Sequence, residues 1–564
     1  MTTGPTTPPT QPTAGGAASP DSSAFHLPAD AVRRPWVPWA VFLSALAVYG
    51  YHLAPTVRDG DAAERVMTLL SLGLCHPPGV PFYTLIGFVW IRLLGFLEPA
   101  VAANALSAVS AAGAVALTFL ICRRIAASDL ASAVAALSMA FHPLLWSQAL
   151  YSEVYPLNLL FLCATLWYFQ KWARQGTPRD LWAASLLYAL SLMAHQAAVL
   201  WAPALLVYVL ARKRTVFRQP RALAGAIVLA LIGMAPLAYI AIRGCATSMI
   251  FAQDRPDSLK AFFDFLRGAQ FDEENAFDLL LFVERPVFFV AVAFYGYLGI
   301  GLAAVLAGVQ RLWYRRRWET IAAGIGCVMY IAYFAKGKSF DFKTLVIPVL
   351  VPMTLAAAIG WEDWLSHRAS APGRRWRRRA LGAAICLPLL QILIFPSLQS
   401  FVMSRVDSDK GGPVFKTMAH ILAHVPVTFR GDDGPREFAA QVERALAGES
   451  GPYTLMLKWY GYTVLFYYQY AGRQLPHARL YEMIGKRRIN PGEKGVSDVV
   501  VSDRMLLRRD VGRRPVYLIV KEPITQYSGY PLEKIANLPR VDEDKCYLYR
   551  VYPKPPRPGA PARD

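Results

Sequence analysis

Long, uninterrupted apolar segments are the feature that most restricts how this chain can fold. Residues 100–122 and 287–309 each consist almost entirely of apolar residues, and about 20 such residues suffice for a helix to cross a lipid bilayer. Of the 564 residues, only 17% are charged, whereas a soluble domain carries about 25%. The sequence therefore predicts a polytopic membrane protein and excludes a purely cytosolic enzyme.

The apolar segments predict a mainly α fold, a bundle of about eleven transmembrane helices. Residues 81–97 are apolar too, but they are short and carry Arg92, so we expect them to lie at the membrane interface. With that assignment most Lys and Arg residues gather at the cytoplasmic ends of the spans, as the positive-inside rule requires. The expected spans are 37–54, 100–122, 130–148, 154–170, 180–194, 196–211, 222–242, 287–309, 318–335, 343–363 and 379–398.

The formal net charge of +20 does not indicate nucleic-acid binding. The basic residues lie at the ends of apolar segments, where they anchor helices near anionic lipid, whereas a nucleic-acid site needs a basic face on a soluble domain. The seven cysteines are scattered, and none forms a C-x-x-C pair. The sequence therefore predicts no disulfide framework and no metal site built from cysteines.

Changes in composition divide the chain into four parts. We expect a disordered tail at 1–32, a transmembrane domain at 33–404, an extracytoplasmic α/β domain at 405–552 and a second disordered tail at 553–564. The first apolar segment reads as a retained anchor with a cytoplasmic N-terminus. Within the transmembrane domain, residues 55–99 and 244–286 form outer loops. The α/β domain is predicted from a helical stretch at 436–447 and β-type runs at 453–459, 498–503, 515–520 and 547–552.

The first outer loop contains an amphipathic helix. Apolar side chains recur there at helical spacing, with Asp61 and Glu64 on the other side, so the helix is expected to lie on the membrane surface. Residues 59–60 supply the turn before it, and residues 77–79 (P-P-G) end it. The apolar stripe consists of Val66, Leu69, Leu70, Gly73 and Leu74.

Asp61 and Glu64 admit two interpretations from the residues alone. They can simply solvate and cap a surface helix, as acidic residues often do near a helix N-terminus. Alternatively, carboxylates on one face at the outer mouth of the bundle can act as a general base or hold a metal ion.

The surrounding motif resembles that of a known family. Residues 61–64 read D-A-A-E and residues 76–81 read H-P-P-G-V-P, which is similar to the D-S-G-E and H-P-P-G-Y-P signature of the protein O-mannosyltransferase-like family of GT-C membrane glycosyltransferases. The resemblance covers about 55–360, and it departs from the signature at Ala62 and Ala63. Other positions that match the family include Asn104, Ser107, Glu153, His195, Arg243, Asp254 and Asp341.

The resemblance implies a GT-C fold and an inverting glycosyl transfer on the extracytoplasmic face. A sugar, mannose in family members, would move from a polyprenyl phosphate to a hydroxyl of a protein or glycan acceptor, without an assigned metal. Asp61 would act as general base, and Glu64 would orient it or bind the sugar. Residues implied to bind the substrate or the lipid phosphate are His76, Glu153, His195, Arg243 and Asp341.

Several of these residues also have structural interpretations. Glu153 can pair with a basic neighbour, His195 can form a hydrogen bond inside the bundle, and Arg243 can anchor a helix at the interface. For the whole chain, the rival functions are a transporter or flippase of lipid-linked substrates and a non-catalytic scaffold. Transporters often show inverted repeats and broken helices in mid-membrane, and the sequence shows no internal repeat.

Overall fold

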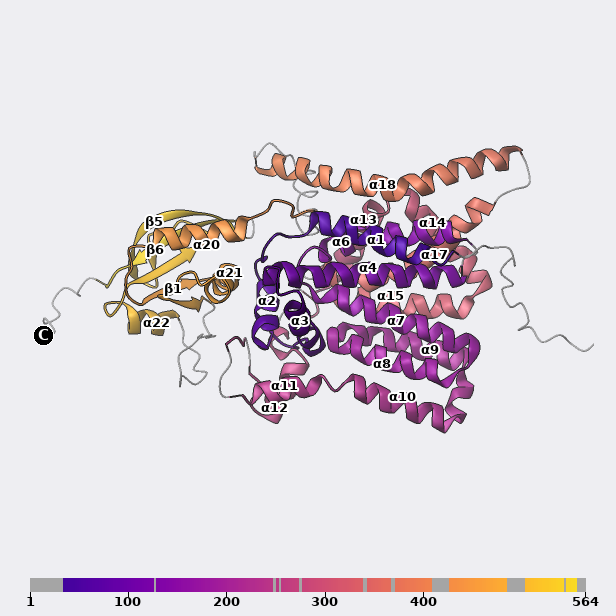
Figure 1. Cartoon of the computed structure of the whole chain (residues 1–564), viewed down its shortest axis with the longest axis horizontal. Helices are drawn as coiled ribbons and strands as arrows, with labels where there is room; N and C mark the ends of the chain where they lie inside the picture. Colours follow the sequence, from indigo (N-terminus) through magenta and orange to yellow (C-terminus); the bar gives the residue numbers. More distant parts are fainter. Residues whose placement is uncertain are drawn as a thin grey trace, which may run out of the picture.

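The computed structural model combines a helical bundle with a smaller domain built on a β-sheet at one end of the bundle (Figure 1). The mainly α prediction is therefore confirmed. The predicted tail at 1–32 and all but two residues of the tail at 553–564 lie outside the described residues. The structure describes residues 34–125, 128–246, 250–252, 255–272, 276–337, 342–366, 371–407, 426–483, 503–541 and 544–554.

The bundle is made of helices that follow the predicted apolar segments. Its first half contains α1 (Val37–His52), α4 (Pro99–Ile125), α5 (Asp129–Ala140), α6 (Pro143–Gln148), α7 (Val154–Gln175), α8 (Pro178–Ala194) and α9 (Ala202–Arg212). Its second half contains α10 (Pro220–Gly233), α11 (Leu237–Gly244), α12 (Leu259–Leu266), α13 (Leu279–Gly296), α14 (Ile300–Arg315), α15 (Arg317–Ala335), α16 (Phe342–Leu345), α17 (Leu350–Ser366) and α18 (Ala371–Asp407).

Several helices have the length and composition of membrane spans. Within the described residues, five segments are long and apolar enough to cross a bilayer: Pro99–Ile125, Pro220–Gly244, Leu279–Gly296, Arg317–Ala335 and Arg379–Phe401. Large apolar side chains are exposed around the bundle, for example at Leu231, Val287, Leu306 and Leu393. Exposed apolar surface of this extent marks contact with lipid or with another protein. The chain is thus a multipass membrane protein.

Several predicted spans are divided into shorter helices in the structure, among them 130–148 (α5 and α6), 222–242 (α10 and α11) and 343–363 (α16 and α17). The single span expected at 287–309 is two helices, because the chain turns between α13 and α14, where Leu298 and Gly299 have φ of 48° and 69°. The segment expected at the interface forms α3 (Pro81–Leu93), whose 13 residues fall short of the about 20 that cross a bilayer.

Helices α14 and α17 approach each other closely at two glycines. A Cβ atom on Gly308 would lie 1.8 Å from the carbonyl oxygen of Ala356, and one on Gly360 would lie 2.0 Å from that of Ala304. Small residues at such crossings let membrane helices pack backbone to backbone. The two glycines therefore set the distance between the helices.

We expect Gly308→Ala to destabilise the bundle by about 1–3 kcal/mol, because the added methyl group forces the two backbones apart. The measurement is the thermal unfolding midpoint in detergent. Gly324→Ala in α15 is the control, since nothing lies within 4 Å of the added Cβ and alanine favours the helix. Equal midpoints for the two variants would show that α14 and α17 have room to adjust.

The C-terminal part forms a six-stranded mixed sheet with the order β2-β1-β3-β6-β5-β4. The predicted runs at 453–459, 515–520 and 547–552 fall on strands of this sheet, whereas Asp503 begins a helix and residues 498–502 lie outside the described part. Strands β1, β2 and β3 are parallel, and the remaining pairs are antiparallel. The elements are α20 (Gly434–Ala445), β1 (Tyr453–Leu457), α21 (Trp459–Tyr470), β2 (Ala478–Glu482), α22 (Asp503–Asp510), β3 (Val516–Val520), β4 (Gln526–Tyr527), β5 (Tyr530–Val541) and β6 (Asp544–Val551).

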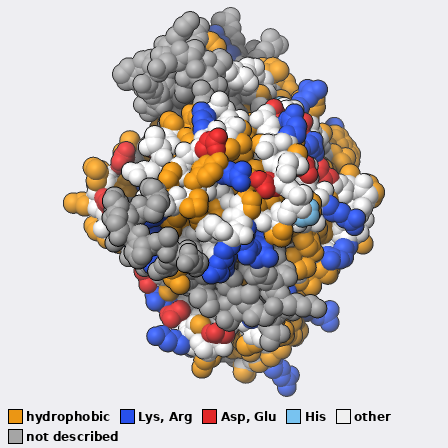
Figure 2. All heavy atoms as spheres, turned by 90° about the vertical axis from the view of Figure 1, so that its left-hand side faces the viewer, with side chains coloured by type: hydrophobic (Ala, Val, Ile, Leu, Met, Phe, Trp, Pro, Cys, Tyr) orange, Lys and Arg blue, Asp and Glu red, His pale blue; other side chains and the backbone are white. Residues whose placement is uncertain are grey.

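The domain that carries this sheet has an outer face on which basic, acidic and apolar side chains are mixed (Figure 2). Its inner side is attached to the first outer loop by polar contacts. The Tyr467 hydroxyl donates to Glu98 over 3.0 Å, and Arg436 pairs with the same carboxylate at 2.8 Å. Arg58 pairs with Asp432 at 2.6 Å. These contacts place α21 against helix α2 (Asp61–Ser71) of the loop.

Candidate active site

Helix α2 begins at a glycine and is buried within the protein. Gly60 has φ 61° and ψ −132°, a combination that is open essentially to glycine alone. The expected turn at 59–60 is thus present, but the helix ends at Ser71, where Leu72 turns left-handed with φ 49°, and not at the prolines 77–78. Both the apolar and the polar side of α2 are buried against protein, including Glu64 and Arg65, so the polar side does not face solvent as it would in an isolated surface helix.

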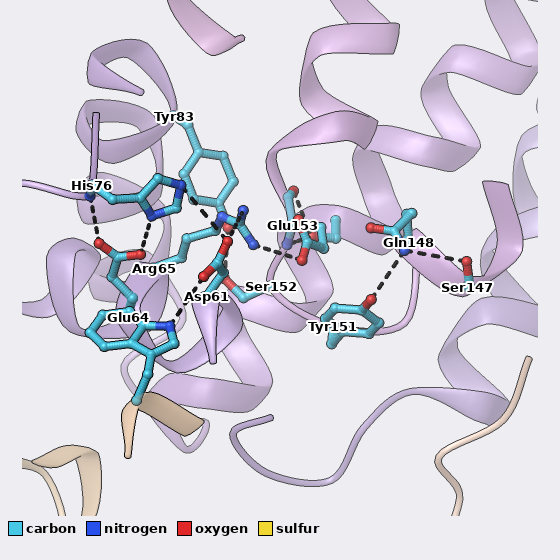
Figure 3. Close-up of polar contacts among 12 residues, drawn as sticks. Asp61, Glu64, Arg65, His76, Tyr83, Ser147, Gln148, Tyr151, Ser152 and Glu153 are labelled. Carbon is cyan, nitrogen blue, oxygen red and sulfur yellow. Dashed lines mark hydrogen bonds and ion pairs between the residues drawn. The ribbon is translucent and has the colours of Figure 1, made fainter. Parts of the chain in front are cut away.

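Burial of the polar side is possible because each charge finds a partner. Glu64 has no exposed side-chain surface, and it accepts hydrogen bonds from His76, from the backbone N–H at 2.6 Å and from Nδ1 of the ring at 2.5 Å. The loop after α2 therefore folds back onto the helix, and His76 stands beside it (Figure 3).

Arg65 connects α2 to the bundle. Its Nη1 lies 2.6 Å from Oε1 of Glu153, and the two side chains are 5% and 9% exposed. Ser107 holds the backbone of Glu153, because its hydroxyl donates to the Glu153 carbonyl and accepts from the Glu153 N–H. Asn104, one turn earlier in α4, donates to the carbonyls of residues 54 and 56, where the loop begins. Asn104, Ser107 and Glu153, which were singled out by the resemblance to the family, thus hold the first outer loop in place.

Asp61 is the most exposed carboxylate of the group, with 35% of its side chain accessible. Its Oδ2 lies 3.6 Å from Nη2 of Arg65 and 3.8 Å from Nε2 of His76. Its Oδ1 accepts a hydrogen bond of 3.3 Å from the indole N–H of Trp459, at the start of α21. Asp61 is therefore held between two cations and the C-terminal domain (Figure 3).

The surroundings determine the charge of Asp61 and His76. Burial acts to raise the pKa of Asp61, but the charges of His76 and Arg65 and the Trp459 hydrogen bond outweigh it and hold that pKa below its ordinary value. Burial acts to lower the pKa of His76, but Glu64 and Asp61 outweigh it and raise that pKa from 6.5 to about 9. At neutral pH the site thus contains an ionised Asp61 beside an imidazolium.

This pairing predicts how stability depends on pH. Because the pKa of His76 is raised in the folded state, its stabilising contribution is fully present below its ordinary value of 6.5 and is lost as the pH rises through about 9. We expect the difference in thermal midpoint between the wild type and His76→Asn to be largest at pH 6 and to vanish above pH 9. A difference that stays constant over this range would show that His76 is neutral in the folded protein.

The same three side chains have a spacing that suits a metal ion. One ligand atom from each of Asp61, Glu64 and His76 lies within 4.8 Å of the others. In the structure, Nδ1 of His76 bonds directly to Oε2 of Glu64, and Nε2 of His76 lies 3.8 Å from Oδ2 of Asp61. The two cations of the site also face three carboxylates, which leaves one negative charge, at the exposed Asp61. This arrangement suits a base that accepts a proton.

The structure places two of the other predicted site residues, His195 and Arg243, at the ends of other helices. His195 packs on the ring of Tyr155, and its Nδ1 accepts the N–H of Ala197, so it caps the 3-10 helix η1 (Gln196–Trp201). Arg243 lies at the end of α11, beside Tyr239, whose hydroxyl donates to the carbonyl of Gly73. Asp254 and Asp341 lie outside the described residues.

Sequence reasoning missed two residues of the site. Arg65 follows Asp61 by four positions, so both lie on one face of α2, and this spacing was the available signal. Trp459 lies nearly 400 residues later, and no motif connects it to the first loop.

Residues 61–217 match the family model described as the N-terminal domain of protein O-mannosyl-transferase TMEM260. The chain is 34% identical over 123 residues to protein O-mannosyl-transferase TMEM260 of Mus musculus, and the aligned region covers 22% of this chain and 18% of that protein. It is 26% identical over 134 residues to protein O-mannosyl-transferase tmem260 of Dictyostelium discoideum, with coverage of 23% and 16%. The chain thus matches less than a fifth of the length of these relatives.

The fold is similar to that of a solved structure over nearly the whole chain. The structure of ArnT from Cupriavidus metallidurans bound to undecaprenyl phosphate superposes with a TM-score of 0.58 at 14% identity, covering 92% of this chain and 98% of ArnT. The apo form gives a TM-score of 0.56 at 15% identity, with coverage of 91% and 97%. The resemblance to the protein O-mannosyltransferase-like family is confirmed over residues 61–217, and the GT-C-type fold is confirmed for the chain as a whole.

Proposed function

We propose that this chain is an integral-membrane glycosyltransferase that moves a sugar from a polyprenyl phosphate to an acceptor hydroxyl, with inversion. The observation that carries the proposal is the environment of Asp61, an ionised and partly exposed carboxylate beside two cations at the end of a GT-C-type bundle. The matched TMEM260 domain begins at this same residue.

The residues of the site take different roles in this reaction. Asp61 accepts the proton of the acceptor hydroxyl as that oxygen attacks the anomeric carbon. The His76 imidazolium, 22% exposed, faces the negative charge that develops on the leaving phosphate. Glu64 and Glu153 are too buried to meet a substrate, and they act by holding His76 and Arg65.

The donor, the face of the membrane and the acceptor belong to the same proposal. The similarity in fold to ArnT, which was solved with undecaprenyl phosphate, supports a polyprenyl phosphate as the carrier. The relatives named O-mannosyl-transferases support mannose as the sugar and a protein hydroxyl as the acceptor. We place the site on the extracytoplasmic face, the N-terminus in the cytoplasm and the C-terminal domain outside, as the distribution of basic residues indicates.

The proposal is tested with the purified protein in proteoliposomes. These receive polyprenyl phosphates that carry radiolabelled sugars, with mannose tested first, and a membrane-protein extract as acceptor. We expect label to appear in protein, in a linkage stable to removal of the lipid, and the configuration of the product to be opposite to that of the donor. Chelation of divalent metal should leave the rate unchanged, since Arg65 and His76 already neutralise two of the three carboxylates and the third, Asp61, acts as the base.

Two results would contradict the proposal. If no donor gives labelled product but the intact lipid moves between leaflets, the chain is a transporter of lipid-linked substrates. If neither transfer nor movement occurs, the chain is a scaffold. Loss of activity on chelation, restored by one metal, would instead assign Asp61, Glu64 and His76 to a metal ion.

A further inference from the structure

A side chain of the C-terminal domain reaches the proposed general base. Trp459, the first residue of α21, donates its indole N–H to Oδ1 of Asp61 at 3.3 Å. Trp459 lies outside residues 61–217, where the chain matches the TMEM260 domain model, whereas Asp61 is the first residue of that match. It is a direct link between the C-terminal domain and the reacting carboxylate.

The two oxygens of Asp61 have different surroundings. Oδ1 is engaged by Trp459, whereas Oδ2 lies 3.6 Å from Arg65 and 3.8 Å from His76. Those distances are longer than a normal hydrogen bond, so the two cations stabilise the charge on Oδ2 without tying its lone pairs. Of the two oxygens, Oδ2 is the one positioned to accept a proton.

The fold of the C-terminal domain fixes the direction of the indole N–H. The ring of Trp459 stacks on that of Tyr462, with centroids 6.3 Å apart and an angle of 18° between the planes, and Tyr462 is completely buried. Tyr460, which follows Trp459 in the chain, lies close to the start of α2. A Cβ atom on Gly60 would be 3.0 Å from the ring of Tyr460. The tryptophan therefore has little freedom to leave Asp61.

We propose that Trp459 is a positioning residue of the transferase, which holds Oδ1 of Asp61 so that Oδ2 faces the acceptor hydroxyl. This inference rests on the proposed function and assigns the C-terminal domain a part in the catalytic step. In that step the hydroxyl proton moves to Oδ2 and the acceptor oxygen bonds to the anomeric carbon. The bond from that carbon to the phosphate breaks, and its electron pair leaves with the lipid phosphate.

The kinetic test removes the N–H while keeping the ring. Trp459→Phe retains an aromatic ring that can stack on Tyr462, and benzothienylalanine at position 459 replaces only the indole N–H by sulfur. Because a hydrogen bond to a charged group is lost, we expect kcat to fall about tenfold or more in both variants. The KM for the lipid-linked donor should stay within about twofold.

The control is Tyr467→Phe, which removes a contact of the same helix with Glu98 but none with Asp61. If Trp459 served only to attach the domain, both substitutions would reduce kcat and the thermal midpoint together. We expect Tyr467→Phe to leave kcat within about twofold. A fall in kcat of equal size in the two variants, or no fall with benzothienylalanine, would overturn the proposal.

A spectroscopic measurement tests the contact without any activity. In protein labelled with 5-fluorotryptophan, the ¹⁹F resonance of Trp459 is assigned by its absence in Trp459→Phe. We expect that resonance to move in Asp61→Ala while the resonance of Trp146, buried in the bundle, stays in place. An unmoved Trp459 resonance would overturn the contact.

The two measurements separate failure of this inference from failure of the proposed function. A wild-type protein that transfers no sugar would overturn the proposed function and with it the catalytic role of Trp459. An active wild-type protein whose kcat is insensitive to loss of the N–H would overturn the positioning role alone.

Discussion

Asp61→Asn is expected to reduce sugar transfer by about 10²–10⁴-fold, the usual contribution of a general base. Asparagine has nearly the same shape, and its amide oxygen can still accept the hydrogen bond from Trp459. It cannot accept the acceptor proton at neutral pH, and it removes the charge between Arg65 and His76. The rate is measured as label transferred from the lipid-linked sugar under saturating donor.

Asp59→Asn is the matched control, because it makes the same chemical change two residues earlier. Asp59 lies 3.8 Å from Arg58 and is not one of the clustered side chains Asp61, Glu64 and His76, so we expect transfer within about twofold of the wild type. Both variants should elute from size exclusion as the wild type does. Equal activity of Asp61→Asn and the wild type would show that Asp61 is structural and that the base lies elsewhere.

Glu153→Gln is expected to destabilise the protein strongly, by about 3–5 kcal/mol, because it leaves the guanidinium of Arg65 buried with only the more distant Asp61 carboxylate as a counter-charge. The two side chains are almost inaccessible and 2.6 Å apart, so water cannot replace the lost carboxylate. The measurement is unfolding in mixed micelles, followed by the thermal midpoint. Transfer should fall as well, since Arg65 also helps to hold Asp61.

Asp264→Asn provides the comparison, because it breaks an ion pair with Arg267 in which both side chains are well exposed. Such an exposed pair is screened by water and adds little to stability. We expect the double variant Arg65→Gln with Glu153→Gln to be more stable than Glu153→Gln alone, since it removes the unpaired charge. If Glu153→Gln were as mild as Asp264→Asn, Arg65 would have another partner of equal strength.

Much of the bundle could be predicted because a bilayer imposes a length and a composition on each helix. The turn at Leu298 could not be predicted, since apolar residues continue through it and only a left-handed backbone marks the break. The burial of α2 could not be predicted from the sequence either. The polar side of an amphipathic helix is expected to face water. That expectation changes only when the charged residues that neutralise the polar side, such as Glu153, are known to pack against it, and the sequence does not show this.

The candidate site also contains residues that the sequence could predict and residues that it could not. Asp61, Glu64 and His76 lie within one short motif, so their proximity could be predicted from the sequence. The resemblance implied that Glu64 orients Asp61 or binds the sugar, and its complete burial and its two bonds to His76 support the positioning role proposed above. Trp459 could not be predicted, because contacts between distant segments leave no periodic signal in a single sequence.

The contact between α2 and α21 has a consequence for the order in which the protein matures. The two residues that it joins are 398 positions apart, and contacts of such long sequence separation form late in folding. The first loop is synthesised early, but its base acquires its final geometry only after the sheet of the last domain has formed. On the proposed function, a chain that is still being made, or one that ends before β1, would sit in the membrane with an incomplete site and transfer little sugar.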